Sequence, residues 1–164
     1  MSLYSIFVLD LFTDEIVAEY TGRPTFADEG HELLRKLCIF YNAQACYEQN
    51  LKGIYAYFQK MRSLHLLCDT PEYLKDKGMV KIGTYGNTMK GILATAPINN
   101  YANQLTRDWL MKPVVMVDKD GNEQMMPQLY KVRNRAFLKE CILYNPHINV
   151  DRIRSFGLLM LFRQ

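Results

Sequence analysis

The chain opens with two apolar runs separated by a polar stretch. Residues Leu3 to Leu9 are nearly all apolar or β-favouring, and residues Glu15 to Thr21 place their apolar side chains mainly at every second position. This spacing puts alternate side chains on one face of a strand, so both runs predict strands. Residues Asp10 to Asp14 provide the turn, and Gly22-Arg23-Pro24 ends the second run. We therefore expect an antiparallel hairpin.

The next part of the chain alternates helical and extended patterns. Leucines and aromatic residues spaced as on one helix face predict a helix from Thr25 to Phe40. Ala45, Cys46 and Tyr47 suit the interior of a buried strand, which ends at Glu48. The same reasoning predicts a helix at Leu51 to Met61, a short buried strand at Leu64 to Leu67, and a short helix from Pro71 to Lys77 that Gly78 closes.

The second half of the chain is mainly helical. Residues Met79 to Ala94 interleave glycines with polar and basic residues, which predicts a loop suited to a phosphate backbone, although they match no phosphate-loop motif. The remaining predicted elements are a helix from Pro97 to about Met111, a projecting hairpin of Lys112 to Val117 and Glu123 to Met126, a helix from Arg133 to Tyr144, and a last helix capped by Asn149 or Asp151. This order of elements indicates an α/β protein with a mixed sheet.

Composition fits one globular domain over residues 1–164. The chain is 49% hydrophobic and 23% charged, with a net charge of +3 that is compatible with a polyanionic partner. No apolar run approaches the roughly 18 residues of a membrane span, so we expect no membrane partner. Asp10 interrupts the apolar start of the chain, which is not typical of a signal peptide.

The cysteines favour a reducing compartment. Cys38, Cys46, Cys68 and Cys141 are scattered in apolar contexts without a CxxC pair. This pattern predicts reduced thiols in a cytosolic protein and argues against a zinc site.

Two carboxylates stand where an active site can form. Glu48 ends a predicted core strand, and Asp151 opens the last helix. Strand ends in open α/β sheets lie at the ligand crevice, so Glu48 is either a surface residue or a metal ligand. Asp151 is either a helix cap or a second ligand. Hard divalent cations such as Mg²⁺ bind oxygen ligands of this kind.

Four blocks of sequence resemble the C-terminal nuclease domain of the large terminase subunit of tailed bacteriophages. They cover nearly the whole chain in order: Ile16 to Pro24; Tyr41-Asn42-Ala43 with Tyr47 to Gly53; Ile98 to Tyr101 with Arg107 to Leu110; and Tyr144-Asn145-Pro146 with Asp151-Arg152-Ile153 and Gly157 to Leu161. The resemblance implies an RNase H-like mixed sheet flanked by helices, with a small β-hairpin insertion. It also implies an endonuclease that cuts concatemeric phage DNA with two Mg²⁺ or Mn²⁺ ions.

The resemblance assigns the site residues and their surroundings. Glu48 matches the acidic residue at the end of the fourth strand, and Asp151 matches the acidic residue on the last helix, so both are expected to be catalytic and to bind metal. The implied partners are double-stranded DNA, the portal and the small terminase subunit, and the implied location is the cytoplasm of the bacterial host. No Walker A motif is present, so we expect no ATPase domain and no bound nucleotide.

One departure from the family pattern affects the expected activity. The family carries a further aspartate on a first, central strand that would precede the hairpin, and Asp10 does not match it. We therefore expect a domain that is partial at its N-terminus, lacks this strand and is impaired as a nuclease. The loss of a middle strand would expose two strand edges, to which a second copy of the chain could pair.

Basic residues complete the expected site. Lys52, Lys81, Lys90 and Arg152 are candidates for contact with the DNA backbone, and solvated surface charge is the alternative for each. Arg152 could instead balance the charge of Asp151. For the whole domain, the alternatives to an active endonuclease are an inactive nuclease-fold module that binds DNA or packaging proteins, and a junction resolvase of the same fold.

Overall fold

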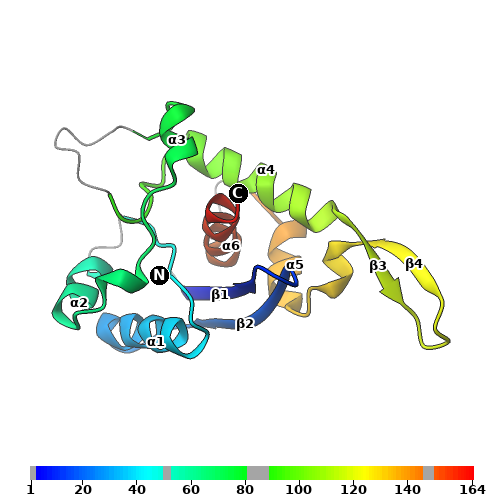
Figure 1. Cartoon of the computed structure of the whole chain (residues 1–164), viewed down its shortest axis with the longest axis horizontal. Coiled ribbons are helices and arrows are strands. Elements are labelled where there is room, and N and C mark those ends of the chain that lie inside the picture. Colours follow the sequence, from blue (N-terminus) through cyan, green and yellow to red (C-terminus); the bar gives the residue numbers. More distant parts are fainter. Residues whose placement is uncertain (1–2, 50–52, 81–88, 146–149) are drawn as a thin grey trace.

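The computed structural model of the chain describes residues 3–49, 53–80, 89–145 and 150–164 (Figure 1). These residues form a mixed α/β protein with two small antiparallel sheets and six α-helices. The first sheet pairs β1 (Tyr4–Asp10) with β2 (Glu15–Gly22), in a register that runs from Tyr4 opposite Gly22 to Asp10 opposite Glu15. This sheet confirms the predicted N-terminal hairpin.

The helices agree with the predicted helical segments. They are α1 (Ala27–Phe40), α2 (Ile54–Lys60), α3 (Glu72–Asp76), α4 (Ala96–Met111), α5 (Arg135–Ile142) and α6 (Asp151–Phe162). Local sequence explains several ends. The Thr95 hydroxyl accepts a hydrogen bond from the backbone of Ile98, and Pro97 lies in the first turn, so α4 begins there. Asn134 caps α5 in the same way, through the backbone N–H of Phe137.

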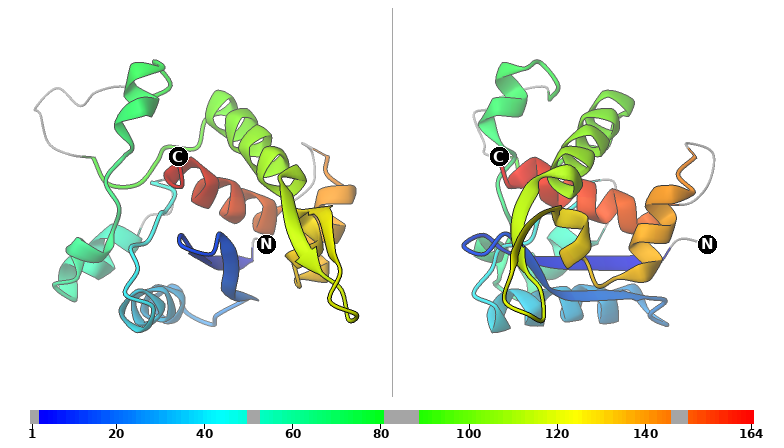
Figure 2. Two further views of the ribbon diagram at one scale, coloured as in Figure 1. Left: turned by 45° about the vertical axis from the view of Figure 1, so that its right-hand side comes forward. Right: turned by 90° about the vertical axis from the view of Figure 1, so that its right-hand side faces the viewer.

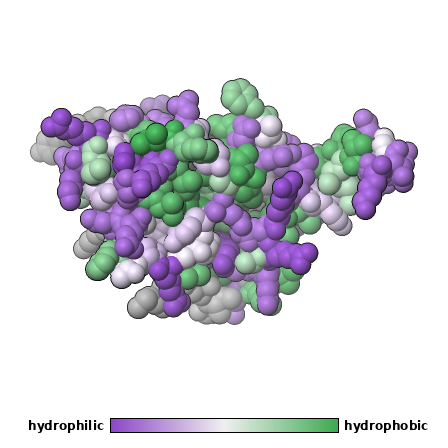
Figure 3. Space-filling model, turned by 90° about the horizontal axis from the view of Figure 1, so that it is seen from below, coloured by the Kyte–Doolittle hydropathy of each residue, from purple (hydrophilic) through white to green (hydrophobic). Residues whose placement is uncertain are grey.

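The second sheet is an arm that stands clear of the body. It pairs β3 (Pro113–Val117) with β4 (Glu123–Pro127), and the Asp118 carboxylate orders the turn by accepting hydrogen bonds from the backbone N–H groups of Asp120 and Asn122. Hydrophobic side chains gather on the arm (Figure 3), where Val117 and Met125 are each more than 60% exposed. The predicted projecting hairpin is confirmed.

Three extended segments lie in or beside the two remaining predicted strands and the end of the predicted Met79 to Ala94 loop. The bridged segments, as we call residues 45–49, 67–70 and 89–92, pair through isolated bridges rather than through a ladder. The bridges join Ala45 to Leu67, Glu48 to Ile92, and Asp69 to Lys90. The predicted strand at Leu64 to Leu67 is wrong, because Leu64–Leu66 form a 3₁₀ turn closed by hydrogen bonds from Leu66 to Ser63 and from Leu67 to Leu64. The predicted mixed sheet is therefore not continuous across the described residues.

Helices cover both faces of the β1–β2 hairpin. Two views place α6 on one face, with α4 beyond it, and α1 on the opposite face (Figures 1 and 2). Phe156 of α6 is fully buried between three aromatic rings, those of Phe7, Trp109 and Phe137, whose centroids lie 4.9–5.4 Å away. This aromatic cluster fixes α6 against β1, α4 and α5, and so determines where the N-terminus of α6 lies.

None of the helices in the described ranges has the length and the apolar composition needed to cross a membrane.

Candidate functional site

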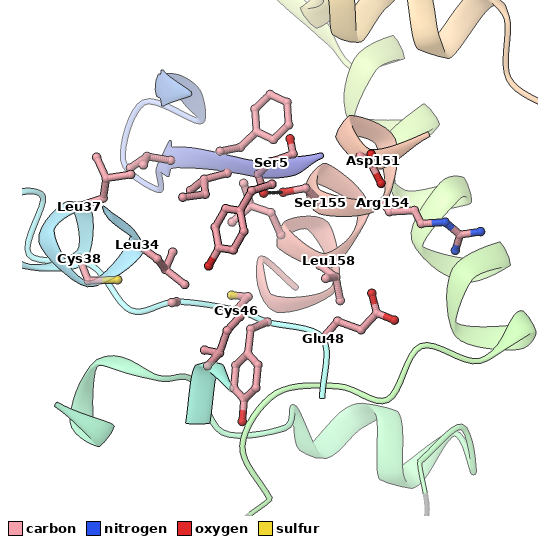
Figure 4. A pocket seen from close by; sticks show the side chains of 18 of the residues that line it. Ser5, Leu34, Leu37, Cys38, Cys46, Glu48, Asp151, Arg154, Ser155 and Leu158 are labelled. Carbon is pink, nitrogen blue, oxygen red and sulfur yellow. Dashed lines mark hydrogen bonds between the residues drawn. The ribbon is translucent and has the colours of Figure 1, made fainter. Parts of the chain in front are cut away.

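A cavity separates β1 from the first bridged segment. Its volume is about 590 Å³, and most of its walls come from β1, α1, residues 43–48 and α6 (Figure 4). We call it the central cavity. Its volume lies within the range of ordinary ligand pockets. Most of its lining is apolar, including Leu34 and Leu37 of α1 and Leu158 of α6, but acidic and basic side chains lie at its edge.

Glu48 lies on the wall formed by the first bridged segment. The backbone there is held by the hydrogen bond from Ile92 N to Tyr47 O, at 3.0 Å, and by the one from Gln49 N to Ile92 O, at 2.9 Å. The Gln49 side chain adds a bond of 2.8 Å to the carbonyl of Lys90. The half-buried side chain of Glu48 lines the cavity. Its position at the end of an extended segment agrees with the sequence interpretation, although the segment is not a regular strand.

Asp151 lies at the N-terminus of α6, where a carboxylate is favoured by the helix dipole. One of its oxygens, Oδ2, accepts a hydrogen bond of 2.6 Å from the backbone N–H of Leu3. Ser155, one turn later, donates to the carbonyl of Ser5 at 2.8 Å. Two hydrogen bonds therefore hold the start of α6 against β1 and against Leu3, the residue just before it. The Asp151 carboxylate joins α6 to this distant part of the chain, which a helix cap alone does not do.

The fold brings the two predicted site residues to the same cavity. Glu48 and Asp151 both line it, and Figure 4 shows them on the same side, with Leu158 between them. In the described part of the chain, no group of three or more His, Cys, Asp or Glu side chains is placed to hold a metal ion. Two carboxylates match what Mg²⁺ usually takes from a protein, with water and substrate phosphate completing its shell. A two-metal centre needs further carboxylates.

Lys90 and Arg152, the two predicted DNA-contacting cations that the structure describes, do not line the central cavity. Lys90 donates to the carbonyl of Leu67 and to the Asp69 carboxylate, both at 2.8 Å, so it joins two bridged segments. The Arg152 guanidinium pairs with Glu140 of α5, and its backbone N–H donates to the same carboxylate, which links α5 to α6. Lys52 and Lys81 lie outside the described residues. The role of each in DNA binding stays a prediction.

Sequence reasoning missed two arginines at the cavity. Arg154 lies one helical turn after Asp151 and is exposed, and Arg23 lies just after β2; both line the central cavity. The i, i+3 spacing of Asp151 and Arg154 on α6 is a signal that could have identified the first of them, because it places both on one helix face. Arg23 has no comparable local signal.

We compared the chain with protein-family models, with curated proteins and with solved structures, and none of them matches it. Support for a function of this chain therefore comes from the four sequence blocks and from the geometry of the central cavity.

Proposed function

We propose that this chain is a nuclease domain of the terminase type, which cuts concatemeric phage DNA by metal-dependent hydrolysis of phosphodiester bonds. The observation that supports the proposal is that Glu48 and Asp151, from distant parts of the sequence, line the same cavity. In this proposal the domain acts in the cytoplasm of a bacterial host, on double-stranded DNA brought to it by the portal and the small terminase subunit.

The residues at the cavity have complementary roles in this proposal. Glu48 and Asp151 hold a hard divalent cation, Mg²⁺ or Mn²⁺, which when bound supplies an activated water and stabilises charge on the phosphate. Arg154 and Arg23 lie at the same cavity and contact the DNA backbone, because exposed guanidinium groups bind phosphate oxygens well. Lys52, Lys81 and Lys90 extend this contact along the duplex.

The RNase H-like fold with an absent central strand is part of the proposal. Ala45, Tyr47 and Gln49 make their backbone hydrogen bonds to the other bridged segments. Successive residues of an extended segment direct their backbone N–H and C=O groups to opposite sides, so those of Cys46 and Glu48 face the central cavity. β1 borders the opposite side of the cavity and pairs with β2 through one edge only. A strand placed in the cavity would join β1–β2 to the bridged segments and would bring a third carboxylate to Glu48 and Asp151.

The first experiment measures plasmid nicking and Mn²⁺ binding side by side. We expect slow nicking and binding of Mn²⁺, both lost in Glu48→Gln and Asp151→Asn, because each removes one anionic ligand. Asp108→Asn, an exposed carboxylate on α4 outside the cavity, is the matched control and should behave as the unaltered chain. Nicking and Mn²⁺ binding that survive both cavity substitutions would contradict the proposal.

A second candidate is a module that binds DNA or packaging proteins without cutting. It is favoured by the hydrogen bond that engages Asp151 with Leu3 and by the absence of a third carboxylate beside the pair within the described residues. Salt-dependent DNA binding with no Mn²⁺ uptake would support this module over the nuclease.

A further inference from the structure

Two thiols face each other on neighbouring bridged segments. The Sγ atoms of Cys46 and Cys68 lie 3.6 Å apart. Ala45 and Leu67, the residues just before them, form a parallel bridge, and the backbone N–H of Cys68 donates to the carbonyl of Ala45 at 3.0 Å. The two cysteines are therefore in register on adjacent extended segments, and the contact between their side chains is set by the backbone pairing.

We propose that Cys46 and Cys68 are a redox modification site, a dithiol that closes to an intramolecular disulfide on reaction with a low-molecular-weight disulfide such as oxidised glutathione. Neighbours in register on adjacent extended segments have Cα atoms roughly 5 Å apart, which lies within the range that a disulfide spans. The sulfurs must approach by about 1.5 Å to bond. Isolated bridges, rather than a full ladder, hold the two segments, so a movement of this size disturbs few hydrogen bonds.

The surroundings give the two thiols different roles. The hydrogen bond from Cys46 lowers the pKa of Cys68; burial opposes this, and the nearby charge of Lys90 adds to the lowering. Lys90 is held there by Asp69 and by the carbonyl of Leu67. Because the thiolate is the nucleophile, the ammonium group of Lys90, held next to Cys68, favours Cys68 as the attacking thiol and leaves Cys46 to resolve the mixed disulfide.

The chemistry balances with two molecules of released thiol. The Cys68 thiolate attacks one sulfur of oxidised glutathione, breaks its S–S bond and releases one glutathione thiolate, leaving a mixed disulfide on Cys68. Cys46 then loses its proton to the released thiolate or to water and attacks the Cys68 sulfur, which expels the second glutathione. The protein dithiol is oxidised and the glutathione disulfide is reduced. Cys68 is partly exposed, so a small disulfide can reach the attacking sulfur from solvent.

The other two cysteines serve as internal controls. Cys38 is buried on α1, where burial raises its pKa to about 11. Cys141 lies on α5, where burial likewise raises its pKa to about 11. Both should stay reduced under conditions that close the Cys46–Cys68 pair. The closed disulfide would join the segment that carries Glu48 to its neighbour, but its formation does not depend on nuclease activity, so this inference and the proposed function can fail separately.

The test incubates the reduced full chain in glutathione buffers of increasing oxidised fraction, traps free thiols with iodoacetamide and maps the peptides by mass spectrometry. We expect one intramolecular disulfide, between Cys46 and Cys68, that forms in the folded chain and is reversed by excess reduced glutathione. Cys46→Ser should instead accumulate a mixed disulfide at Cys68, and Cys141→Ser should behave as the unaltered chain.

Several outcomes would overturn the proposal. One is a folded chain whose Cys46 and Cys68 remain reduced when the buffer is fully oxidised. Another is a set of linkages distributed among all four cysteines. If Cys46→Ser fails to fold, the disulfide map of the unaltered chain decides the question. The map of the folded chain is then compared with that of the chain oxidised in urea, which should show linkages scattered among all four cysteines.

Discussion

The carboxylate of Asp14, in the turn of the first hairpin, receives two hydrogen bonds of 2.7 Å from the guanidinium of Arg163, at the other end of the described chain. Trp109 and Lys112 donate to the same carboxylate, each at 3.0 Å. One side chain therefore joins the β1–β2 turn to α4 and to the end of α6. An arginine that donates two hydrogen bonds to one carboxylate has a defined geometry, and this interaction is stronger than a single hydrogen bond between neutral groups.

Asp14→Asn should lower the free energy of unfolding by about 1–2 kcal/mol at neutral pH. Burial disfavours the charged carboxylate, but the hydrogen bonds from Arg163, Trp109 and Lys112 outweigh it and lower the pKa of Asp14 to about 2. A pKa below its unfolded value means that the ionised group stabilises the fold above about pH 4, and that this contribution declines as the pH falls toward 2.

Urea unfolding from about pH 7 to about pH 3 measures the effect of Asp14→Asn. The difference in the free energy of unfolding between the unaltered chain and the variant should shrink by roughly half at the acidic end. Asp108→Asn, exposed on α4, is the control and should change little at any pH. A difference that grows with acidity would contradict the assigned role of Asp14.

Phe156→Ala should cost about 3–5 kcal/mol, the usual range for deleting a fully buried aromatic ring. The ring contacts β1, α4 and α5 at once, so its loss leaves a cavity where four elements meet. Phe12→Ala removes a fully exposed ring and is the matched control. Chemical denaturation of both variants makes the comparison, and equal costs would disprove the position of Phe156 in the core.

Gly91→Ala should destabilise the bridged segments. Gly91 has a φ of +75°, and an added Cβ would lie 2.7 Å from the carbonyl oxygen of Tyr47. Left-handed backbone alone costs roughly 1–2 kcal/mol for a residue with a Cβ. Gly121→Ala, at φ +85° with nothing within 4 Å of the added atom, isolates that conformational cost.

The expected result is a larger loss of stability for Gly91→Ala than for Gly121→Ala, measured by thermal unfolding. The difference between the two variants reports the contact with Tyr47, because both carry the same conformational cost. Equal losses would mean that the segment around Gly91 moves away freely.

Arg154→Ala should weaken binding to double-stranded DNA and reduce the dependence of log affinity on log salt by about 1, if Arg154 neutralises one phosphate. Arg107→Ala, an exposed arginine of α4 outside the central cavity, is the matched control. Fluorescence anisotropy over a series of salt concentrations measures both. An unchanged slope in Arg154→Ala would remove that residue from the proposed DNA surface.

Elements with local signals could be predicted from the amino-acid sequence. The hairpin of β1 and β2, the long helices α1 and α4, and the arm with its Asp118 turn follow from alternation, helical spacing and turn chemistry within short windows. The same kind of signal placed Asp151 at the start of α6. Each of these features depends on interactions between residues close in the chain.

Contacts between distant residues could not be predicted in this way, because they arise from long-range packing. Ala45, Cys46 and Tyr47 have strand-like side chains, but a segment becomes a strand only if a full ladder forms beside it, and here each neighbour supplies a single bridge. Leu64–Leu66 form a 3₁₀ turn instead of a strand, because their backbone groups make hydrogen bonds between residues three positions apart.

The contacts that matter for function are also long-range. The positions of Glu48 and Asp151 on one cavity, of Arg152 beside Glu140 and of Cys46 beside Cys68 arise from the packing of α6 and the bridged segments. No periodicity along the chain encodes such contacts, because they depend on how the buried aromatic cluster orients whole elements.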